Sequence, residues 1–207
     1  MIRRRMAREG NRIRQRELWS AAAPAVNAAA FAAGALGGFF LCWWLVGSGH
    51  LAAERMLVGY APAVDARAGA VSFWAALWDI GRWPLLVWIL GSTALGRWMV
   101  PLAFGVRGFL LSFAVAGLSV ADQGGVLLAF CLFGLSALVS LPVLFLLGSQ
   151  SWEMAGQIRG RLFATLSDYP RRYWLRRLIG LIGVLVCALA EYWWLPAVLR
   201  RLSPLFG

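Results

Sequence analysis

The segment 83–121 constrains the fold most, because only two formal charges, Arg97 and Arg107, interrupt it. A helix needs about 20 apolar residues to cross the roughly 30 Å hydrocarbon core of a bilayer. At 39 residues, this run is twice that length. Inside lipid the backbone must satisfy its own hydrogen bonds, which favours helices. The run therefore predicts two membrane-spanning helices joined by a tight reversal.

Three further apolar stretches are long enough to cross a membrane. Of the 207 residues, 61% are hydrophobic and only 14% are charged, which leaves little room for a separate soluble domain. We therefore expect an all-α fold, a polytopic membrane helical bundle with about five transmembrane helices in a single transmembrane domain, 21–207. The expected spans are 25–47, 83–104, 107–121, 126–148 and 178–199.

The first of these stretches could instead be a cleaved signal peptide. Its apolar run exceeds the 7 to 15 residues usual for the core of a signal peptide, and residues 49–53 make a poor cleavage site. We therefore expect a retained helix.

The positive charge gives the bundle a direction. The net charge is +11, every basic residue is Arg, and the arginines concentrate in two blocks, 3–16 and 159–177. Such blocks are typical of the cytoplasmic flanks of membrane helices. We expect a basic cytoplasmic arm at 1–20, an outer loop at 48–82, and a cytoplasmic loop at 149–177. Nucleic acid is the other partner to consider, but no aromatic-basic interleaving accompanies the charge, so we expect none.

The residues that usually carry catalysis or bind metals are scarce. The chain has one histidine, His50, and its three cysteines, Cys42, Cys131 and Cys187, lie far apart inside apolar stretches. Neither a Ser-His-Asp triad nor a zinc site can be assembled from these residues. We expect no catalytic site, no metal site and no cofactor, so the protein is not expected to be an enzyme.

A few ionisable residues lie within or beside the expected spans. Asp79 and Arg82 are three residues apart, so they could form an interfacial ion pair on one face of a helix. Glu191 lies near the outer end of the last span. These residues, with Arg97 and Arg107, either pair and snorkel at the interface or serve a transport path or a partner contact.

Small residues suggest where helices pack and where the chain reverses. Gly34 and Gly38 form a full GxxxG spacing, which permits close packing between helices. We expect the reversal of the long run between Gly96 and Gly108, because Pro101 and the glycines there can end a helix. The residues of this expected corner motif are Gly91, Gly96, Pro101, Arg107, Gly108 and Phe109.

The same segment resembles a known family. It reads Ile89-Leu90-Gly91-Ser92, then Leu95-Gly96, Pro101, and Arg107-Gly108-Phe109 followed by Phe113. This is similar to the stage II sporulation protein M family, over residues 83–150. The resemblance implies a non-enzymatic scaffold in the bacterial cytoplasmic membrane. Such a scaffold anchors peptidoglycan-hydrolase partners at the septum of sporulating cells while the forespore is engulfed.

A second function class remains open from the sequence. The chain could be a permease-like membrane subunit of an export system driven by a separate ATPase. That hypothesis predicts that the segment 149–177, or the corner from Arg97 to Arg107, docks an ATPase subunit.

Overall fold

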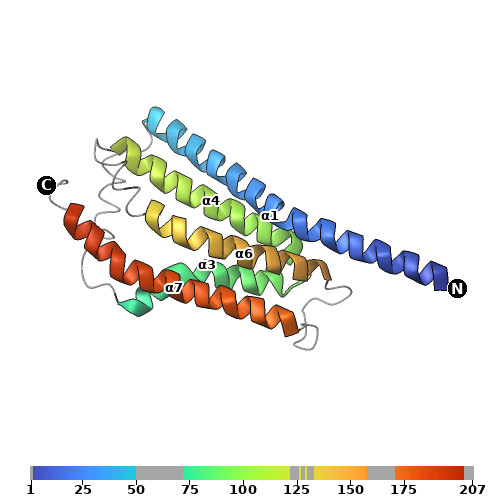
Figure 1. The fold of residues 1–207 in the computed structure, drawn as a ribbon. Coiled ribbons are helices and arrows are strands. Elements are labelled where there is room, and N and C mark those ends of the chain that lie inside the picture. The colour runs from blue at the N-terminus through green and yellow to red at the C-terminus, as the bar shows by residue number, and fades with distance from the viewer. Residues whose placement is uncertain are drawn as a thin grey trace.

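The computed structural model describes residues 2–49, 72–121, 126, 129, 133–157 and 171–202. Within this part of the chain the architecture is an all-α bundle, which confirms the expected fold class (Figure 1). The helices are α1 (Ile2–Gly47), α3 (Phe73–Gly91), α4 (Gly96–Ala121), α6 (Leu135–Gln157) and α7 (Arg171–Leu202).

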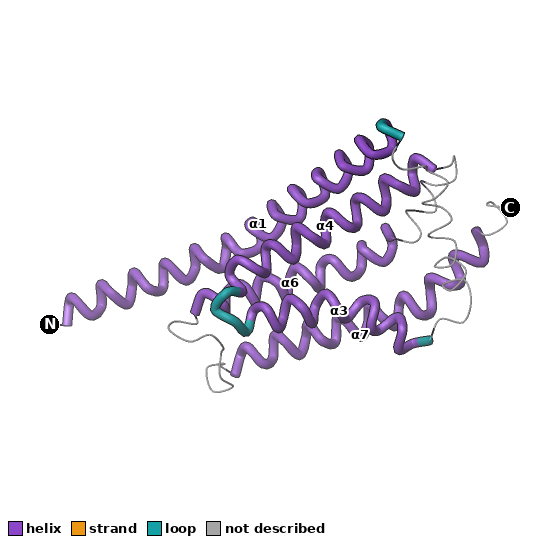
Figure 2. Tube along the Cα trace, turned by 180° about the vertical axis from the view of Figure 1, so that it is seen from behind, coloured by secondary structure: helices purple, strands orange, loops and turns teal. Residues whose placement is uncertain are grey.

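The helices lie side by side and alternate in direction (Figures 1 and 2). Helices α1, α4 and α7 run away from the end of the bundle where the N-terminal part of α1 projects, and α3 and α6 run back towards it. Helix α6 contacts each of the other four helices, whereas α1 packs mainly on α4. Helix α6 therefore lies at the centre of the bundle and α1 at one side.

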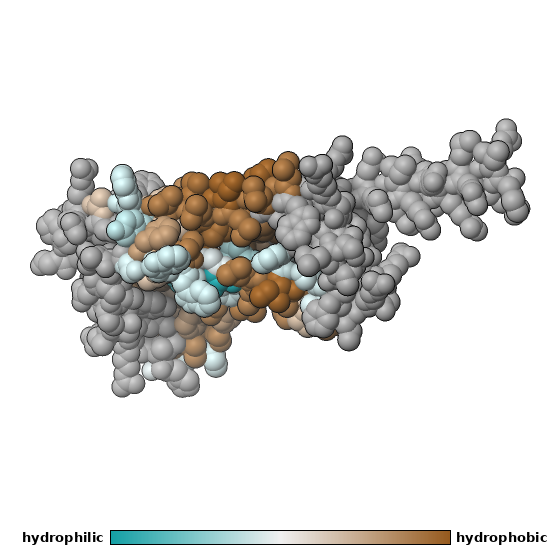
Figure 3. All heavy atoms as spheres, turned by 90° about the horizontal axis from the view of Figure 1, so that it is seen from below, coloured by the Kyte–Doolittle hydropathy of each residue, from teal (hydrophilic) through white to brown (hydrophobic). Residues whose placement is uncertain are grey.

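Three of the described helices are long and apolar enough to cross a membrane: Ala22–Gly47, Gly96–Ser119 and Ala137–Gly156. A shorter apolar helix covers Leu178–Trp193. Many large apolar side chains on these helices face outward, and apolar residues cover much of the described surface in Figure 3. Lipid is the natural solvent for such a surface, so the protein is located in a membrane.

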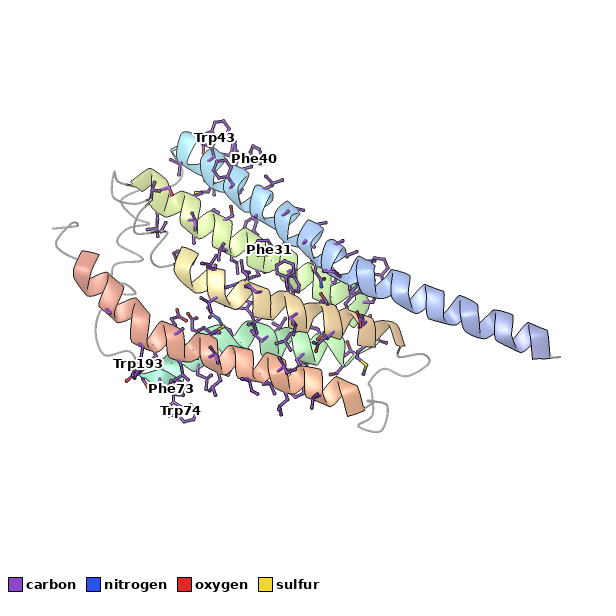
Figure 4. The ribbon with its side chains drawn as sticks, viewed as in Figure 1. Phe31, Phe40, Trp43, Phe73, Trp74 and Trp193 are labelled. Carbon is purple, nitrogen blue, oxygen red and sulfur yellow. The ribbon has the colours of Figure 1, made fainter. Side chains whose placement is uncertain are left out.

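Aromatic side chains gather at the end of the bundle opposite the projecting part of α1. Figure 4 shows Phe40 and Trp43 near the far end of α1, and Phe73, Trp74 and Trp193 near the same end of α3 and α7. The ring of Phe73 meets that of Tyr192 edge to face, with ring centroids 6.1 Å apart. Aromatic rings are typical of the level at which a helix leaves the hydrocarbon.

The reversal of the long apolar run was predicted in the wrong place. Helix α3 ends at Gly91 and α4 begins at Gly96, so the chain turns at residues 92–95. The N–H groups of Ser92 and Thr93 donate to the carbonyls of Ile89 and Leu90, both at 3.0 Å. The hydroxyl of Thr93 also donates to the Leu90 carbonyl at 2.8 Å. These bonds satisfy carbonyls that a helix C-terminus leaves without partners.

Other helix boundaries also differ from the predicted ones, in each case because a helix is longer than predicted. The arm expected at 1–20 is helical from Ile2 and continuous with the first span. Helix α3 begins at Phe73, so the last part of the expected outer loop 48–82 and the start of the span at 83 are both corrected. Asp79 and Arg82, which were expected in the outer loop, lie within α3, where their side chains form an ion pair at 2.7 Å.

The expected loop 149–177 is shorter than predicted for the same reason. Helix α6 continues to Gln157 and α7 begins at Arg171, so only residues 158–170 lie outside the described part. Most of the expected outer loop, residues 50–71, also lies outside it.

Two clusters of buried side chains hold the bundle together. One joins α3, α4 and α6 around Val87, Phe104, Leu144 and Trp152. The Phe104 ring is fully buried and its centroid lies 4.8 Å from that of Phe145. The other joins α3, α6 and α7 around Ile80, Leu147, Val184, Cys187 and Ala188.

Candidate functional site

Glycines bring α1 and α4 into backbone contact. We call the contact between the two helices at Gly34 and Gly38 of α1, and at Gly105 and Gly108 of α4, the glycine seam. A Cβ atom added to Gly34 would overlap the backbone of Gly105, and one added to Gly38 would overlap the backbone of Phe109. A Cβ on Gly108 would overlap the carbonyl of Phe31. The close packing predicted from Gly34 and Gly38 is therefore confirmed, and Gly108 is its counterpart on α4.

The other glycines of the expected corner motif hold the α3–α4 turn against α6. A Cβ on Gly91 would lie 2.7 Å from the Cα atom of Ser151, which is too close for any side chain. A Cβ on Gly96 would lie 3.0 Å from the Cβ of Ala155 and would overlap Leu90. Both glycines are buried. The turn can therefore pack on α6 only because these positions carry no side chain.

Pro101 lies inside α4, where sequence reasoning placed the reversal. Proline has no N–H, so it cannot bond to the carbonyl four residues earlier, which is that of Arg97. The structure supplies another donor: the indole Nε1–H of Trp152 in α6 donates to the Arg97 carbonyl at 2.9 Å. The proline is thus tolerated inside a helix because a neighbouring helix satisfies the carbonyl that it frees.

Arg107 does not lie at a corner. It is eleven residues beyond the start of α4, or roughly 16 Å along the helix axis. Its guanidinium carbon lies 5.2 Å from the ring centroid of Trp83 in α3, and its side chain is partly buried. A charge near a membrane centre costs roughly 2.5 to 3.5 kcal/mol on insertion scales. The aromatic face of Trp83 offsets part of that cost.

Arg97, in contrast, is exposed at the start of α4. Its guanidinium carbon lies 5.7 Å from the ring centroid of Trp152. The two arginines of the long run therefore have similar aromatic partners at different depths in the bundle.

Asn27 is a candidate site residue that sequence reasoning did not single out. Its side chain is fully buried in α1, and within the described residues neither amide atom has a hydrogen-bond partner. A Cβ on Gly148 of α6 would lie 3.4 Å from its Nδ2 atom. Unpartnered amides are rare in protein interiors. The available signal was that Asn27 is the one strongly polar residue in its apolar stretch.

The ion pair predicted on α3 is confirmed. The Arg82 Nη2 and Asp79 Oδ1 atoms lie 2.7 Å apart, with 52% of the Arg82 side chain and 36% of the Asp79 side chain exposed. Glu191 is partly buried on α7, one turn after the buried Cys187. Glu191 therefore lies in the part of α7 that carries Tyr192 and Trp193.

The described residues contain no group of three or more His, Cys, Asp or Glu side chains that could hold a metal ion. Cys42 and Cys187 are buried free thiols on different helices. His50 and Cys131 lie outside the described residues. The features that the structure brings together are thus close-packed glycines, one bridged proline and single charges beside tryptophans.

Comparison of the chain with protein-family models, with curated proteins and with solved structures finds no match. The resemblance to the stage II sporulation protein M family stays a prediction. Of the residues that carry it, Gly91, Gly96, Gly108 and Phe109 lie at close contacts between helices.

Proposed function

We propose that the chain is a non-enzymatic scaffold that crosses the bacterial cytoplasmic membrane five times, with its N-terminus in the cytoplasm. The alternating directions of the five helices support this topology (Figure 1). The arginine blocks support it as well, because the N-terminal part of α1, the start of α4 and the start of α7 all lie at one end of the bundle. Positive charge concentrated at the cytoplasmic end is the expected pattern.

The observation that carries the proposal is the contact of glycines with backbone atoms. A scaffold must present its faces in one fixed arrangement, and backbone contacts hold helices more rigidly than contacts between flexible side chains do. Gly34, Gly38 and Gly108 provide such contacts between α1 and α4, and Gly91 provides one between α3 and α6. Two pairs of helices, α1 with α4 and α3 with α6, are thereby held by close contacts.

The partners proposed for this scaffold are peptidoglycan hydrolases at the septum of sporulating cells. This rests on the family resemblance and on the topology, which places residues 50–71 outside, where the hydrolases act. Replacing 50–71 by a flexible Gly-Ser linker of equal length should abolish co-purification with the hydrolases. The same replacement at 158–170, on the cytoplasmic side, is the matched control. Unchanged recovery after the first replacement would contradict the proposal.

Arg107 provides a second test of the scaffold. Arg107→Ala should impair sporulation and membrane assembly more than Arg55→Ala, because Arg107 packs on Trp83 between two helices. Arg55 lies outside the described residues, in the expected outer loop. Equal tolerance of the two substitutions would count against a structural role for Arg107.

The alternative function is a permease-like subunit driven by a separate ATPase. The observation that favours it is the gathering of the turn at 92–95, the exposed Arg97 and the start of α7 at one end of the bundle (Figure 1). With Arg107 inside α4, docking would fall on this turn and on 158–170. Co-purification of a nucleotide-hydrolysing partner that is lost on Arg97→Glu would favour this function over the scaffold.

A further inference from the structure

Helix α3 carries an ion pair at the middle of its length. Asp79 and Arg82 are its only formal charges, and their side chains lie 2.7 Å apart. Arg82 lies nine residues from Phe73 and nine from Gly91, the two ends of the helix, or roughly 14 Å from each along the axis. In the five-span topology proposed above, on which this inference rests, that position is near the centre of the hydrocarbon core.

The neighbouring helix carries another arginine at the same depth. Trp83, the residue next to Arg82, has its ring centroid 5.2 Å from the guanidinium carbon of Arg107 in α4. Arg107 lies eleven residues after the start of α4 and fourteen before its end, so it is also far from both ends of its helix. The middle of the α3–α4 side of the bundle therefore carries two guanidinium groups and one carboxylate.

The ion pair faces away from the other helices. Helix α3 turns one row of buried residues towards α4, α6 and α7: Ala76, Ile80, Gly81, Pro84, Val87 and Gly91. The two charges lie outside this row, with 52% of the Arg82 side chain and 36% of the Asp79 side chain exposed. Trp78 and Leu86, one turn to either side of Arg82, are exposed as well. In a membrane, the ion pair therefore meets lipid.

A bilayer adapts to charges at this depth. An arginine near the end of a helix extends its guanidinium to the interface, but around a charge at mid-depth the bilayer thins locally and water enters. The barrier that keeps a phospholipid in one leaflet has the same origin, because its charged headgroup loses water when it enters hydrocarbon. An exposed ion pair halfway across the bilayer therefore lowers the barrier to headgroup crossing.

We propose that this face of α3 is a path along which zwitterionic phospholipids exchange between the two leaflets, without an energy source. The headgroup carries a phosphate and an ammonium group, which match the two charges of the pair. The Arg82 guanidinium can donate two parallel hydrogen bonds to the phosphate, and the Asp79 carboxylate can accept from the ammonium. Replacing one ion pair by two others keeps every charge matched, while the acyl chains stay in the hydrocarbon beside Trp78 and Leu86.

Lipid exchange by the purified full chain tests the proposal directly. The chain is reconstituted into vesicles of phosphatidylethanolamine and phosphatidylglycerol that contain a trace of phosphatidylethanolamine with a fluorophore on one acyl chain. Dithionite added outside bleaches only the outer leaflet of protein-free vesicles. We expect it to bleach both leaflets of vesicles that contain the protein. Bleaching of the outer leaflet alone would overturn the proposal.

A variant without the ion pair links the exchange to α3. Asp79→Leu and Arg82→Leu are combined, because removing both charges leaves neither one unpaired and should preserve the fold. We expect this double variant to exchange lipid at least about tenfold more slowly. Arg97→Leu is the matched control: it also removes an arginine beside a tryptophan, but at the start of α4 rather than at mid-depth. Its rate should equal that of the unaltered chain.

Equal rates for the double variant and the unaltered chain, or an equal loss in Arg97→Leu, would contradict the proposed path. Thermal unfolding in detergent shows whether each variant folds. If the double variant does not fold, exchange by the unaltered chain still decides the proposal.

A leak of small ions through the protein would also bleach the inner leaflet. A soluble fluorophore trapped inside the vesicles detects such a leak. We expect it to stay fluorescent while the labelled lipid is bleached, and bleaching of both at one rate would overturn the proposal. None of these measurements uses hydrolases or ATPase subunits as a readout, so failure of lipid exchange and failure of the scaffold are distinguishable.

Discussion

The two sides of the bundle are packed by opposite means. On one side, α1 meets α4 through the glycine seam, where backbone meets backbone. On the other side, α7 meets α6 through side chains: Leu147 fills the space that Gly180 leaves open, and Val143 fills the space at Gly183. Backbone cannot withdraw from an added atom, whereas a leucine can change its rotamer. The two sides should therefore tolerate substitution very differently.

The largest effect should come from the glycine seam. We expect Gly34→Leu to destabilise the bundle by about 3 kcal/mol or more, because the Gly105 backbone cannot move aside. Gly37→Leu is the matched control, since a Cβ there meets only the Phe109 ring, at 3.8 Å. Thermal unfolding in detergent measures both. If the two variants melt together, the seam is not rigid.

Removing a side chain on the α6–α7 side should have the next largest effect. Leu147 is 5% exposed and packs on Gly180. We expect Leu147→Ala to cost about 2 kcal/mol, at the low end for buried leucines, because the side chains around it can partly close the cavity. The neighbouring Leu146 is 45% exposed, so Leu146→Ala should change the melting temperature little. A loss as large as that of Gly34→Leu would contradict the contrast between the two sides.

The bridge between Trp152 and the Arg97 carbonyl should have a smaller effect. We expect Trp152→Phe to cost about 1 kcal/mol, because it leaves the carbonyl freed by Pro101 without a donor. In a Pro101→Ala background the helix regains its own N–H at position 101, so the same substitution should cost less. A double-mutant cycle measures the difference, and strict additivity would show that the proline and the tryptophan are not coupled.

The smallest effect should come from adding one methyl group on the α6–α7 side. Gly180→Ala would press on the Cδ2 and Cγ atoms of Leu147, a side chain that can shift more easily than a backbone can. We expect a loss of about 1 kcal/mol or less. In a Leu147→Ala background that loss should vanish. If Gly180→Ala lowered the free energy of unfolding as much as Gly34→Leu does, the proposed difference between side-chain contacts and backbone contacts would be wrong.

Much of the fold followed from apolar length and charge. The five helices in the described part of the chain, the close contact at Gly34 and Gly38, and the pairing of Asp79 with Arg82 were each predicted from residues that lie close together in sequence. Such local patterns carry their own physical reason: the width of a bilayer, the absence of a Cβ, or one helical turn between opposite charges.

The features that the sequence did not yield depend on residues far apart in the chain. Pro101 was predicted to end a helix, but Trp152, which is 51 positions later in the sequence, donates the hydrogen bond that the proline cannot. Arg107 was predicted at a corner, because the sequence does not show that Trp83 lies beside it within the bundle. Asn27 gains interest only when α1 is packed against Gly148. In each case a residue is accommodated because of its contact with another helix, and a single sequence does not reveal which helices are in contact.

The length of α1 determines how far its N-terminal end extends beyond the rest of the bundle. Its 46 residues extend over roughly 69 Å, which is more than twice the thickness of the hydrocarbon core. The first 20 of them correspond to roughly 30 Å of helix that continues beyond the glycine seam. The glycine seam fixes the other half of α1 to α4. The length of helix before the seam therefore sets the distance between the N-terminal tip of α1 and the bundle. A partner bound near its tip would be held at a set height from the bilayer, and inserting or deleting single turns between Gln15 and Ala22 would raise or lower it by about 5 Å each.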